Sequence, residues 1–301
     1  MASRLTSFTH DGLTFDVTDD GPLDGEVVVL LHGFPQRASS WRRVAPLLHA
    51  QGYRTVAPDQ RGYSPGARPT GRRAYAAGRL VGDVVALLDA LGEPGRRVHL
   101  VGHDWGAAVG WGVAAALPDR IKTWTAVSVP PVEAFVAAGL RSRQLLRSWY
   151  MLFFQLPAVP EAVATRTPRA FERVLAAAGM REEDLARFRE EIVEHGALPG
   201  GLAWYRALPL NLTRGRKGGK RGKGAGGEGS EKGRGAVRVP TTMVWSDGDA
   251  AIDRVGVDLA ADHVRADYEL VVLTGVSHWV PEHAPEALAE AILERVTSVP
   301  A

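Results

Sequence analysis

The chain has 301 residues, of which 45% are hydrophobic and 23% are charged, a balance typical of a soluble globular protein with a sizeable core. It contains no cysteine, which excludes disulfides, thiolate metal sites and a cysteine nucleophile. Residues 1–15 show no apolar block of the kind found in signal peptides, and the longest uncharged run, 105–118, is too short to span a bilayer. We therefore expect a cytoplasmic protein without membrane insertion.

Positive charge is concentrated in one segment, residues 214–235. This basic segment carries eight Lys and Arg and two Glu, whereas the whole chain has a net charge of only +2. It is rich in glycine and nearly free of apolar residues, so it cannot bury enough surface to offset the entropy lost on ordering. We expect a disordered insertion; the alternative is a tail that contacts RNA, DNA or anionic lipid by charge alone. It has no interleaved aromatic residues on which bases could stack, so we expect no nucleic-acid partner.

Apolar strands and helical patterns alternate along most of the chain. Helices are expected at 79–91, where Leu80, Val84 and Leu88 recur at helical spacing, and at 285–296. Strands are expected at residues 26–33, 53–59, 96–104, 119–131, 239–249 and 268–278. Continuous apolar strands that alternate with helices are typical of a parallel sheet covered by helices on both faces. The sequence therefore predicts an α/β fold.

Residues 131–236 interrupt this alternation. The chain there becomes helical and aromatic, as in "SRQLLRSWYMLFFQLP", and the basic segment lies near its end. We interpret residues 131–236 as a helical cap inserted between two strands of a core formed by residues 1–130 and 237–301.

Four of the expected strands end in chemically reactive groups. In open parallel sheets, ligands bind beyond the carboxyl ends of the strands. The groups that follow the strands are the "HGFP" turn at 32–35, Asp104, Asp249 and His278. Their convergence predicts a single site at this edge of the sheet.

The stretch "GHDWG" at 102–106 has the form of a nucleophile elbow with aspartate in the usual serine position. Gly102 and Gly106 permit a tight strand-to-helix turn that projects Asp104 and directs the backbone N–H of Trp105 toward the reacting centre. An aspartate here could also be a simple helix N-cap. The "HGFP" and "SHW" motifs after other strands favour the catalytic interpretation.

Together these motifs resemble the α/β-hydrolase family, and within it the branch of epoxide hydrolases and haloalkane or haloacid dehalogenases. The resemblance covers nearly the whole chain except the basic segment, through "HGFPQRASSWRRVAPLL", "VAPDQRGYSPGARP", "VGHDWGAAVGW", "VWSDGDAAI" and "GVSHWVPEHAPE". It implies a mostly parallel eight-stranded sheet with helices on both faces and a helical cap. It also implies an oxyanion hole formed by the backbone N–H groups of Phe34 and Trp105.

The expected base is His278, because it follows the last strand, where an imidazole can reach the elbow. It needs an acid to orient its ring. The resemblance places this acid after "TTMVW", where the match favours Asp249 and leaves Asp247 as the alternative. The chain order Asp104, Asp249, His278 agrees with the family.

A carboxylate nucleophile restricts the substrate. Its attack on an ester or amide carbonyl would give an anhydride, a poor intermediate, whereas its attack on a saturated carbon gives an alkyl ester that water can cleave. The substrate should therefore carry an electrophilic carbon with a leaving group, which is an epoxide oxygen or a halide.

The cap distinguishes these two leaving groups. An epoxide opens to a basic alkoxide, which requires a nearby acid such as a tyrosine hydroxyl. Tyr150 in "WYMLFFQLP" and Tyr205 in "AWYRALP" resemble the paired ring-opening tyrosines of epoxide hydrolases, although both could simply pack the cap onto the core. Phe34 stands where haloalkane dehalogenases have a halide-binding asparagine.

The sequence thus predicts an epoxide hydrolase that forms a vicinal diol from an epoxide and water, without a cofactor or a metal. The alternatives are a dehalogenase with the same Asp–His–Asp groups and, in another class, a binding protein without turnover. A homodimer is left open. The residues expected in the substrate pocket are His32, Pro35, Trp149, Phe154 and Trp279.

Overall fold

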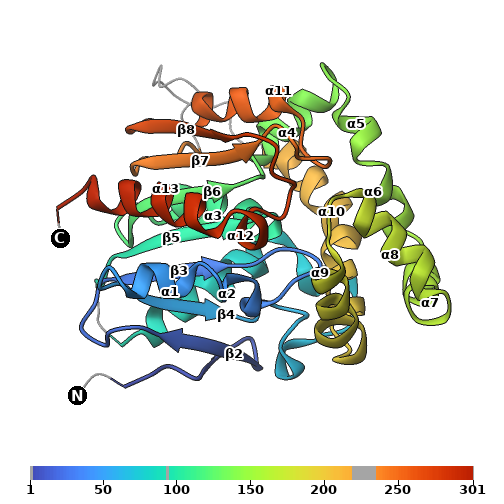
Figure 1. Ribbon diagram of the computed structural model, residues 1–301, viewed down its shortest axis with the longest axis horizontal. Coiled ribbons are helices and arrows are strands. Elements are labelled where there is room, and N and C mark those ends of the chain that lie inside the picture. Colours follow the sequence, from blue (N-terminus) through green and yellow to red (C-terminus); the bar gives the residue numbers. More distant parts are fainter. Residues whose placement is uncertain (1–2, 93–94, 219–234, 301) are drawn as a thin grey trace.

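The structure, a computed structural model, describes residues 3–92, 95–218 and 235–300. Its eight-stranded sheet has the order β1-β2-β4-β3-β5-β6-β7-β8 (Figure 1). The strands are β1 (Ser7–His10), β2 (Leu13–Asp20), β3 (Val27–Leu31), β4 (Arg54–Pro58), β5 (Val98–His103), β6 (Ile121–Val127), β7 (Thr241–Ser246) and β8 (Tyr268–Leu273).

From β4 to β8 all neighbouring strands are parallel, whereas β1 and β2 form an antiparallel pair and β2 is antiparallel to β4. The predicted mostly parallel eight-stranded sheet is confirmed. The sequence predicts six of these eight strands, β3 to β8, because only these show continuous apolar runs. It does not predict β1 and β2. In β2 buried and exposed residues largely alternate instead, as in a strand that faces solvent on one side.

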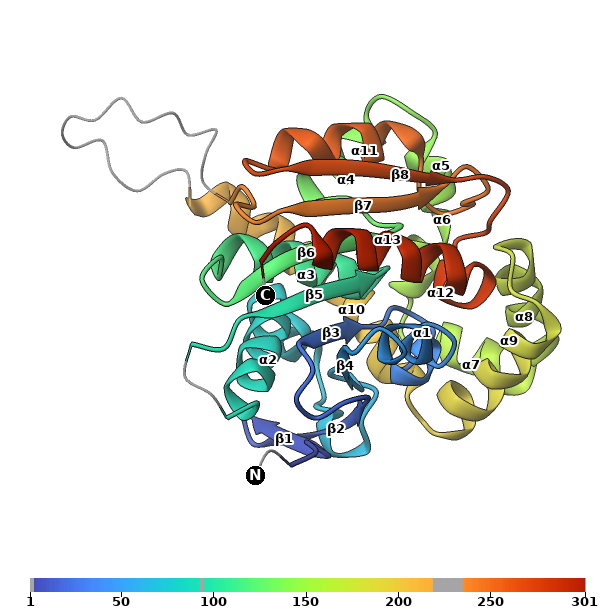
Figure 2. The same ribbon diagram turned by 60° about the vertical axis from the view of Figure 1, so that its left-hand side comes forward.

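Helices cover both faces of the sheet (Figure 2). They are α1 (Ala45–His49), α2 (Ala77–Ala90), α3 (Trp105–Ala116), α4 (Val132–Gly139), α5 (Gln144–Arg147), α6 (Trp149–Phe154), α7 (Val159–Arg166), α8 (Pro168–Ala177), α9 (Glu182–Arg187), α10 (Leu198–Gly218), α11 (Arg254–Asp258), α12 (Val280–His283) and α13 (Pro285–Thr297). A π-helical turn, Phe188–Glu194, continues α9. Within the described ranges, no helix is both long and apolar enough to cross a membrane.

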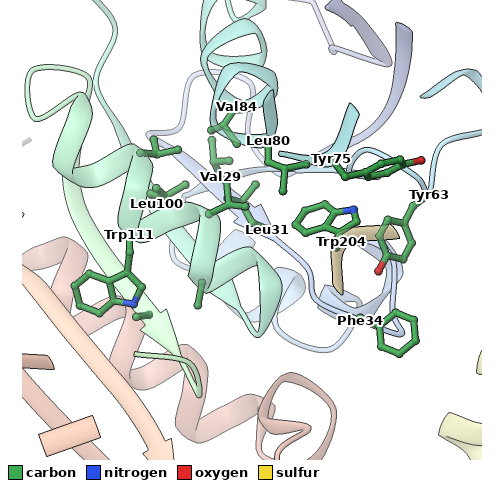
Figure 3. Close-up of a cluster of buried hydrophobic side chains, with 14 of the residues drawn as sticks. Val29, Leu31, Phe34, Tyr63, Tyr75, Leu80, Val84, Leu100, Trp111 and Trp204 are labelled. Atoms are coloured by element: carbon green, nitrogen blue, oxygen red, sulfur yellow. The ribbon is translucent and has the colours of Figure 1, made fainter. Parts of the chain in front are cut away.

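Strand β3 shows how the sheet is sealed on both faces. All five of its residues are buried, and their side chains alternate between two hydrophobic clusters. Val29 and Leu31 pack with Leu80 and Val84 of α2 (Figure 3). Val28 and Leu30 belong to the second cluster, which α1 and α13 cover. With both of its faces closed by apolar packing, β3 carries no polar side chain, and the polar residue His32 follows its end.

The helices α4 to α10 lie between β6 and β7 in the chain, and Figure 1 shows α5 to α10 gathered beyond one end of the sheet. Helix α10 contacts the core closely. The indole of Trp204 donates a hydrogen bond of 2.7 Å to the carbonyl oxygen of Arg61. A side chain at Gly200 would overlap the backbone of Gly62, so glycine permits this close approach.

The basic segment differs in part from its prediction. Residues 214–218 continue helix α10 instead of forming a loop. Residues 219–234, which make up most of the predicted disordered insertion, lie outside the described residues.

We predict that Gly110→Ala in α3 lowers the free energy of unfolding by about 1–3 kcal/mol, because the added Cβ would overlap the Trp124 ring of β6 in a fully packed core. Gly78→Ala in α2 is the matched control: no atom lies within 4 Å of the added Cβ, and alanine is the better helix former by about 1 kcal/mol. Urea unfolding of both variants tests the packing. Equal stabilities of the two variants would contradict it.

Candidate active site

Asp104 lies in the turn between β5 and α3, in a backbone conformation that side chains rarely adopt. Its φ is 53° and its ψ is −117°. The turn is tight because two glycines permit close approach. A Cβ at Gly102 would lie 2.5 Å from the carbonyl oxygen of Gly106, and a Cβ at Gly106 would overlap the carbonyl oxygen of Leu31. The glycines therefore permit the turn that projects the Asp104 carboxylate.

Two backbone N–H groups stabilise the Asp104 carboxylate. The N–H of Phe34, just after β3, donates to Oδ1 of Asp104 at 2.8 Å. A second bond from the backbone N–H of Trp105 helps to lower the pKa of Asp104. The sequence predicted these two groups as an oxyanion hole, and both face the carboxylate.

His278 joins Asp104 to Asp249. Its Nδ1 lies 2.7 Å from Oδ2 of Asp249, and its Nε2 lies 3.4 Å from Oδ2 of Asp104. The other oxygen of Asp249 accepts hydrogen bonds from the backbone N–H groups of Ala251 and Ile252, at 2.7 and 2.9 Å. The alternative acid, Asp247, is exposed and accepts a bond from the backbone N–H of Gly275 instead.

These buried charges alter each other's proton affinity. Burial disfavours an imidazolium at His278, but the carboxylates of Asp249 and Asp104 outweigh it and raise the pKa of His278 to about 10. Burial likewise opposes ionisation of Asp104, yet the bond from His278 keeps the pKa of Asp104 below its ordinary value. In this state the site holds an imidazolium between two carboxylates.

His103 and His32 are buried in supporting positions. Burial lowers the pKa of each to about 4, so both are neutral. Nε2 of His103 donates to the carbonyl oxygen of His278 at 2.9 Å. Nδ1 of His32 donates to the carbonyl oxygen of Gly33 at 3.1 Å, and its Nε2 accepts a bond from the N–H of Gln60 at 3.0 Å. They hold the two loops that carry His278 and the Phe34 N–H.

A cavity of about 210 Å³ adjoins Asp104. Tyr150 of α6 and Tyr205 of α10 line it with their ring centroids 6.1 Å apart, and the Tyr205 ring lies edge-on to Trp105 at 5.0 Å. Burial raises the pKa of both tyrosines, so both hydroxyls remain protonated at neutral pH. The rest of the lining is apolar and comprises Ala108, Val129, Pro130, Val132, Phe135, Val136, Met151, Leu208 and Ile252.

This lining differs from the set expected from the sequence. None of His32, Pro35, Trp149, Phe154 and Trp279 lines the cavity. Phe154 packs behind the tyrosines, Trp279 packs against His278, and Trp149 is 54% exposed at the surface.

Several of the lining residues that the sequence reasoning did not name follow β6 in the stretch "VPPVEAFV" at 129–136. The position of this stretch at the carboxyl end of a strand was a usable signal. Across the described parts of the chain, no group of three or more His, Asp or Glu is placed to hold a metal ion.

Comparison with known proteins agrees with this geometry. The family model described as "Alpha/beta hydrolase family" matches residues 28–291. The chain is 31% identical to the AB hydrolase superfamily protein YfhM of Bacillus subtilis, over 94% of each chain. It is 30% identical to epoxide hydrolase A of Mycobacterium tuberculosis, over 96% of each.

Solved structures show the same similarity. An epoxide hydrolase from Vigna radiata superposes with a TM-score of 0.77 and 30% identity, covering 99% of this chain and 98% of that one. Epoxide hydrolase A from Mycobacterium thermoresistibile superposes with a TM-score of 0.79 and 27% identity, covering 99% of both chains. With an aspartate at its nucleophile elbow, the chain belongs to the alpha/beta hydrolase family, in its epoxide hydrolase branch.

Proposed function

We propose that this protein hydrolyses an epoxide to a vicinal diol through a covalent alkyl ester on Asp104. One observation carries the proposal: the Asp104 carboxylate and two protonated tyrosines, Tyr150 and Tyr205, line the same apolar cavity. A nucleophile and an acid for the leaving oxygen are both needed to open an epoxide. The relatives named epoxide hydrolases support this assignment.

In the first step the tyrosine hydroxyls hold the epoxide oxygen and Asp104 attacks a ring carbon. The carbon–oxygen bond of the ring breaks as the ester bond forms, and the alkoxide takes a proton from a tyrosine. In this arrangement helices α4–α10 act as a cap, residues 131–236, over a core of residues 1–130 and 237–301. The cap supplies the acid and the core supplies the nucleophile.

In the second step His278, oriented by Asp249, takes a proton from water, and the hydroxide attacks the carbonyl carbon of the Asp104 ester. The N–H groups of Phe34 and Trp105 stabilise the resulting oxyanion, which collapses to release the diol. Ester formation also prepares the base. It neutralises one of the two carboxylates that raise the pKa of His278, so the imidazolium gives up its proton more readily, and the tyrosinate left by ring opening takes up a proton in turn.

We predict that His278→Gln forms the ester but does not hydrolyse it, because the glutamine cannot accept a proton from water. After incubation with styrene oxide, mass spectrometry should show a gain of one substrate mass on the peptide that contains Asp104. The double variant Asp104→Asn/His278→Gln is the control and should show no gain. Absence of the adduct in His278→Gln would contradict the covalent mechanism.

Removal of the tyrosine hydroxyls separates an epoxide from a halide as substrate. We predict that Tyr150→Phe/Tyr205→Phe lowers kcat for styrene oxide about 10²–10⁴-fold, the range expected for loss of general acid catalysis. Tyr268→Phe, on β8 and outside the cavity lining, is the control and should leave kcat unchanged. A dehalogenase would give a different result. Its wild type would release halide from a chloroalkane and form no diol from styrene oxide, and the double substitution would not affect the halide release.

The charge coupling predicts how the His278 pKa responds to the state of Asp104. The wild-type imidazole should stay protonated until the pH approaches about 10. Asp104→Asn, which removes one carboxylate as the ester does, should shift its deprotonation to lower pH. A nitrogen-15 NMR titration of the histidines measures both values, with His103 as an internal reference that stays neutral above about pH 4. An unchanged His278 pKa in Asp104→Asn would contradict the coupling.

A further inference from the structure

Exposed apolar side chains are concentrated on one part of the molecule. Of the twelve large hydrophobic residues that are exposed among the described residues, nine lie between residues 132 and 159. We call the five most prominent the apolar patch; they are Leu140, Leu145, Leu146, Trp149 and Leu152, and they are 54% to 84% exposed. Single exposed leucines are ordinary, but such a concentration marks a surface that meets something other than water.

The apolar patch lies next to the mouth of the cavity. Val132 and Val136 of α4 line the cavity and are also 45% and 46% exposed, so the cavity reaches the surface at α4. Figure 1 shows α4, α5 and α6 following one another along one edge of the molecule, and Figure 2 keeps them together. The patch is therefore continuous with the entrance to the candidate active site.

In the stretch of chain that carries the apolar patch, all charged residues are positive. Residues 134–160 contain three arginines and no Asp, Glu or Lys. Arg147 is engaged: it donates to the carbonyl oxygen of Asp249 and lies 3.7 Å from the carboxylate of Asp253. Arg141 and Arg143 are exposed, and neither is paired with a carboxylate of a described residue. In the sequence, both of these arginines lie between Leu140 and Leu145 of the apolar patch.

This combination favours an anionic lipid surface over a second copy of the chain. A two-fold dimer through the patch would bring the arginines of both copies into one interface, and residues 134–160 supply no acid to neutralise them. Leucines and a tryptophan flanked by arginines suit the boundary between acyl chains and phosphate groups.

We propose that the apolar patch docks the protein on an anionic phospholipid surface, with the cavity mouth turned toward the lipid. The leucines enter the acyl boundary while Arg141 and Arg143 bind lipid phosphates. An apolar epoxide dissolved in the lipid then reaches Asp104 without crossing water. This last consequence rests on the proposed function, whereas the docking does not.

Vesicle binding by the full chain, measured without any epoxide, tests the docking. The wild type should sediment with vesicles of phosphatidylcholine and phosphatidylserine, and Leu145→Ser/Leu146→Ser should weaken this binding about tenfold or more. Val174→Ser/Val272→Ser, two exposed residues outside the patch, is the matched control and should bind like the wild type. Arg141→Glu/Arg143→Glu should weaken binding more on vesicles with phosphatidylserine than on phosphatidylcholine alone.

Equal binding by the wild type and Leu145→Ser/Leu146→Ser would overturn the proposal, because the basic segment, still present in both, would then account for it. The proposal would also be overturned if the wild type formed dimers without binding vesicles and Leu145→Ser/Leu146→Ser abolished these dimers. The patch would then bind a second copy of the chain. Both patch variants should keep the wild-type kcat on soluble styrene oxide, which shows that they fold. Vesicle binding by a wild type that does not hydrolyse epoxides would refute the proposed function and leave the docking intact.

Discussion

The candidate site depends on the close approach of two loops at the carboxyl ends of β3 and β5. A side chain at Gly33 would overlap the Asp104 carboxylate, and this closeness lets the N–H of Phe34 donate to Asp104 at 2.8 Å. Asp104 itself is held at a positive φ, a conformation that costs about 1–3 kcal/mol and persists only where the surroundings impose it. The central, fully buried strands supply that constraint, because neither can shift without losing its packing on both faces of the sheet.

His278 is held by the neighbouring strands in the same way. The carbonyl oxygen of His278 accepts bonds from His103 at the end of β5 and from Ser128 after β6, at 2.9 and 3.3 Å. Asp249, after β7, contacts the imidazole. Groups at or just beyond the ends of β5, β6 and β7 thus position one loop after β8. Because these strands are parallel, their carboxyl ends lie at one edge of the sheet. Asp104, Asp249 and His278, which are distant in sequence, therefore lie close enough for their charges to interact.

The helices between β6 and β7 divide into a closely packed part and an exposed part. Helix α10 is anchored to the core through Trp204 and Gly200, and Gln155, just after α6, donates to the carbonyl oxygen of Tyr205 at 2.7 Å. These contacts locate both tyrosines relative to Asp104. In contrast, α4 presents valines and α5 presents leucines to the surface beside the cavity mouth. The closely packed part holds the two proposed acid groups, and the exposed part carries the proposed docking surface.

Much of the site could be predicted from the sequence because its key residues follow strands with continuous apolar runs and lie in short motifs. "GHDWG" identified the elbow, and the order of Asp104, Asp249 and His278 was readable along the chain. The antiparallel strand β2 was not singled out, because its residues largely alternate between buried and exposed and give no continuous apolar run. The cavity lining was predicted poorly, since it depends on which faces of short helices turn inward: Trp149 lies at the surface, whereas Met151, two residues away, lines the cavity.

The sequence by itself identified an aspartate, Asp104, at the elbow, and the proposed attack on a saturated carbon follows from this residue type. It also determined the parallel sheet, through the periodicity of its apolar runs. Only the tertiary structure decided between Asp247 and Asp249 as the partner of His278. Both are aspartates of one short turn, and only the structure shows which side chain is buried and directed toward the imidazole. It alone placed Tyr150 and Tyr205 in one cavity with Asp104, since that proximity depends on how α6 and α10 pack over the ends of the strands.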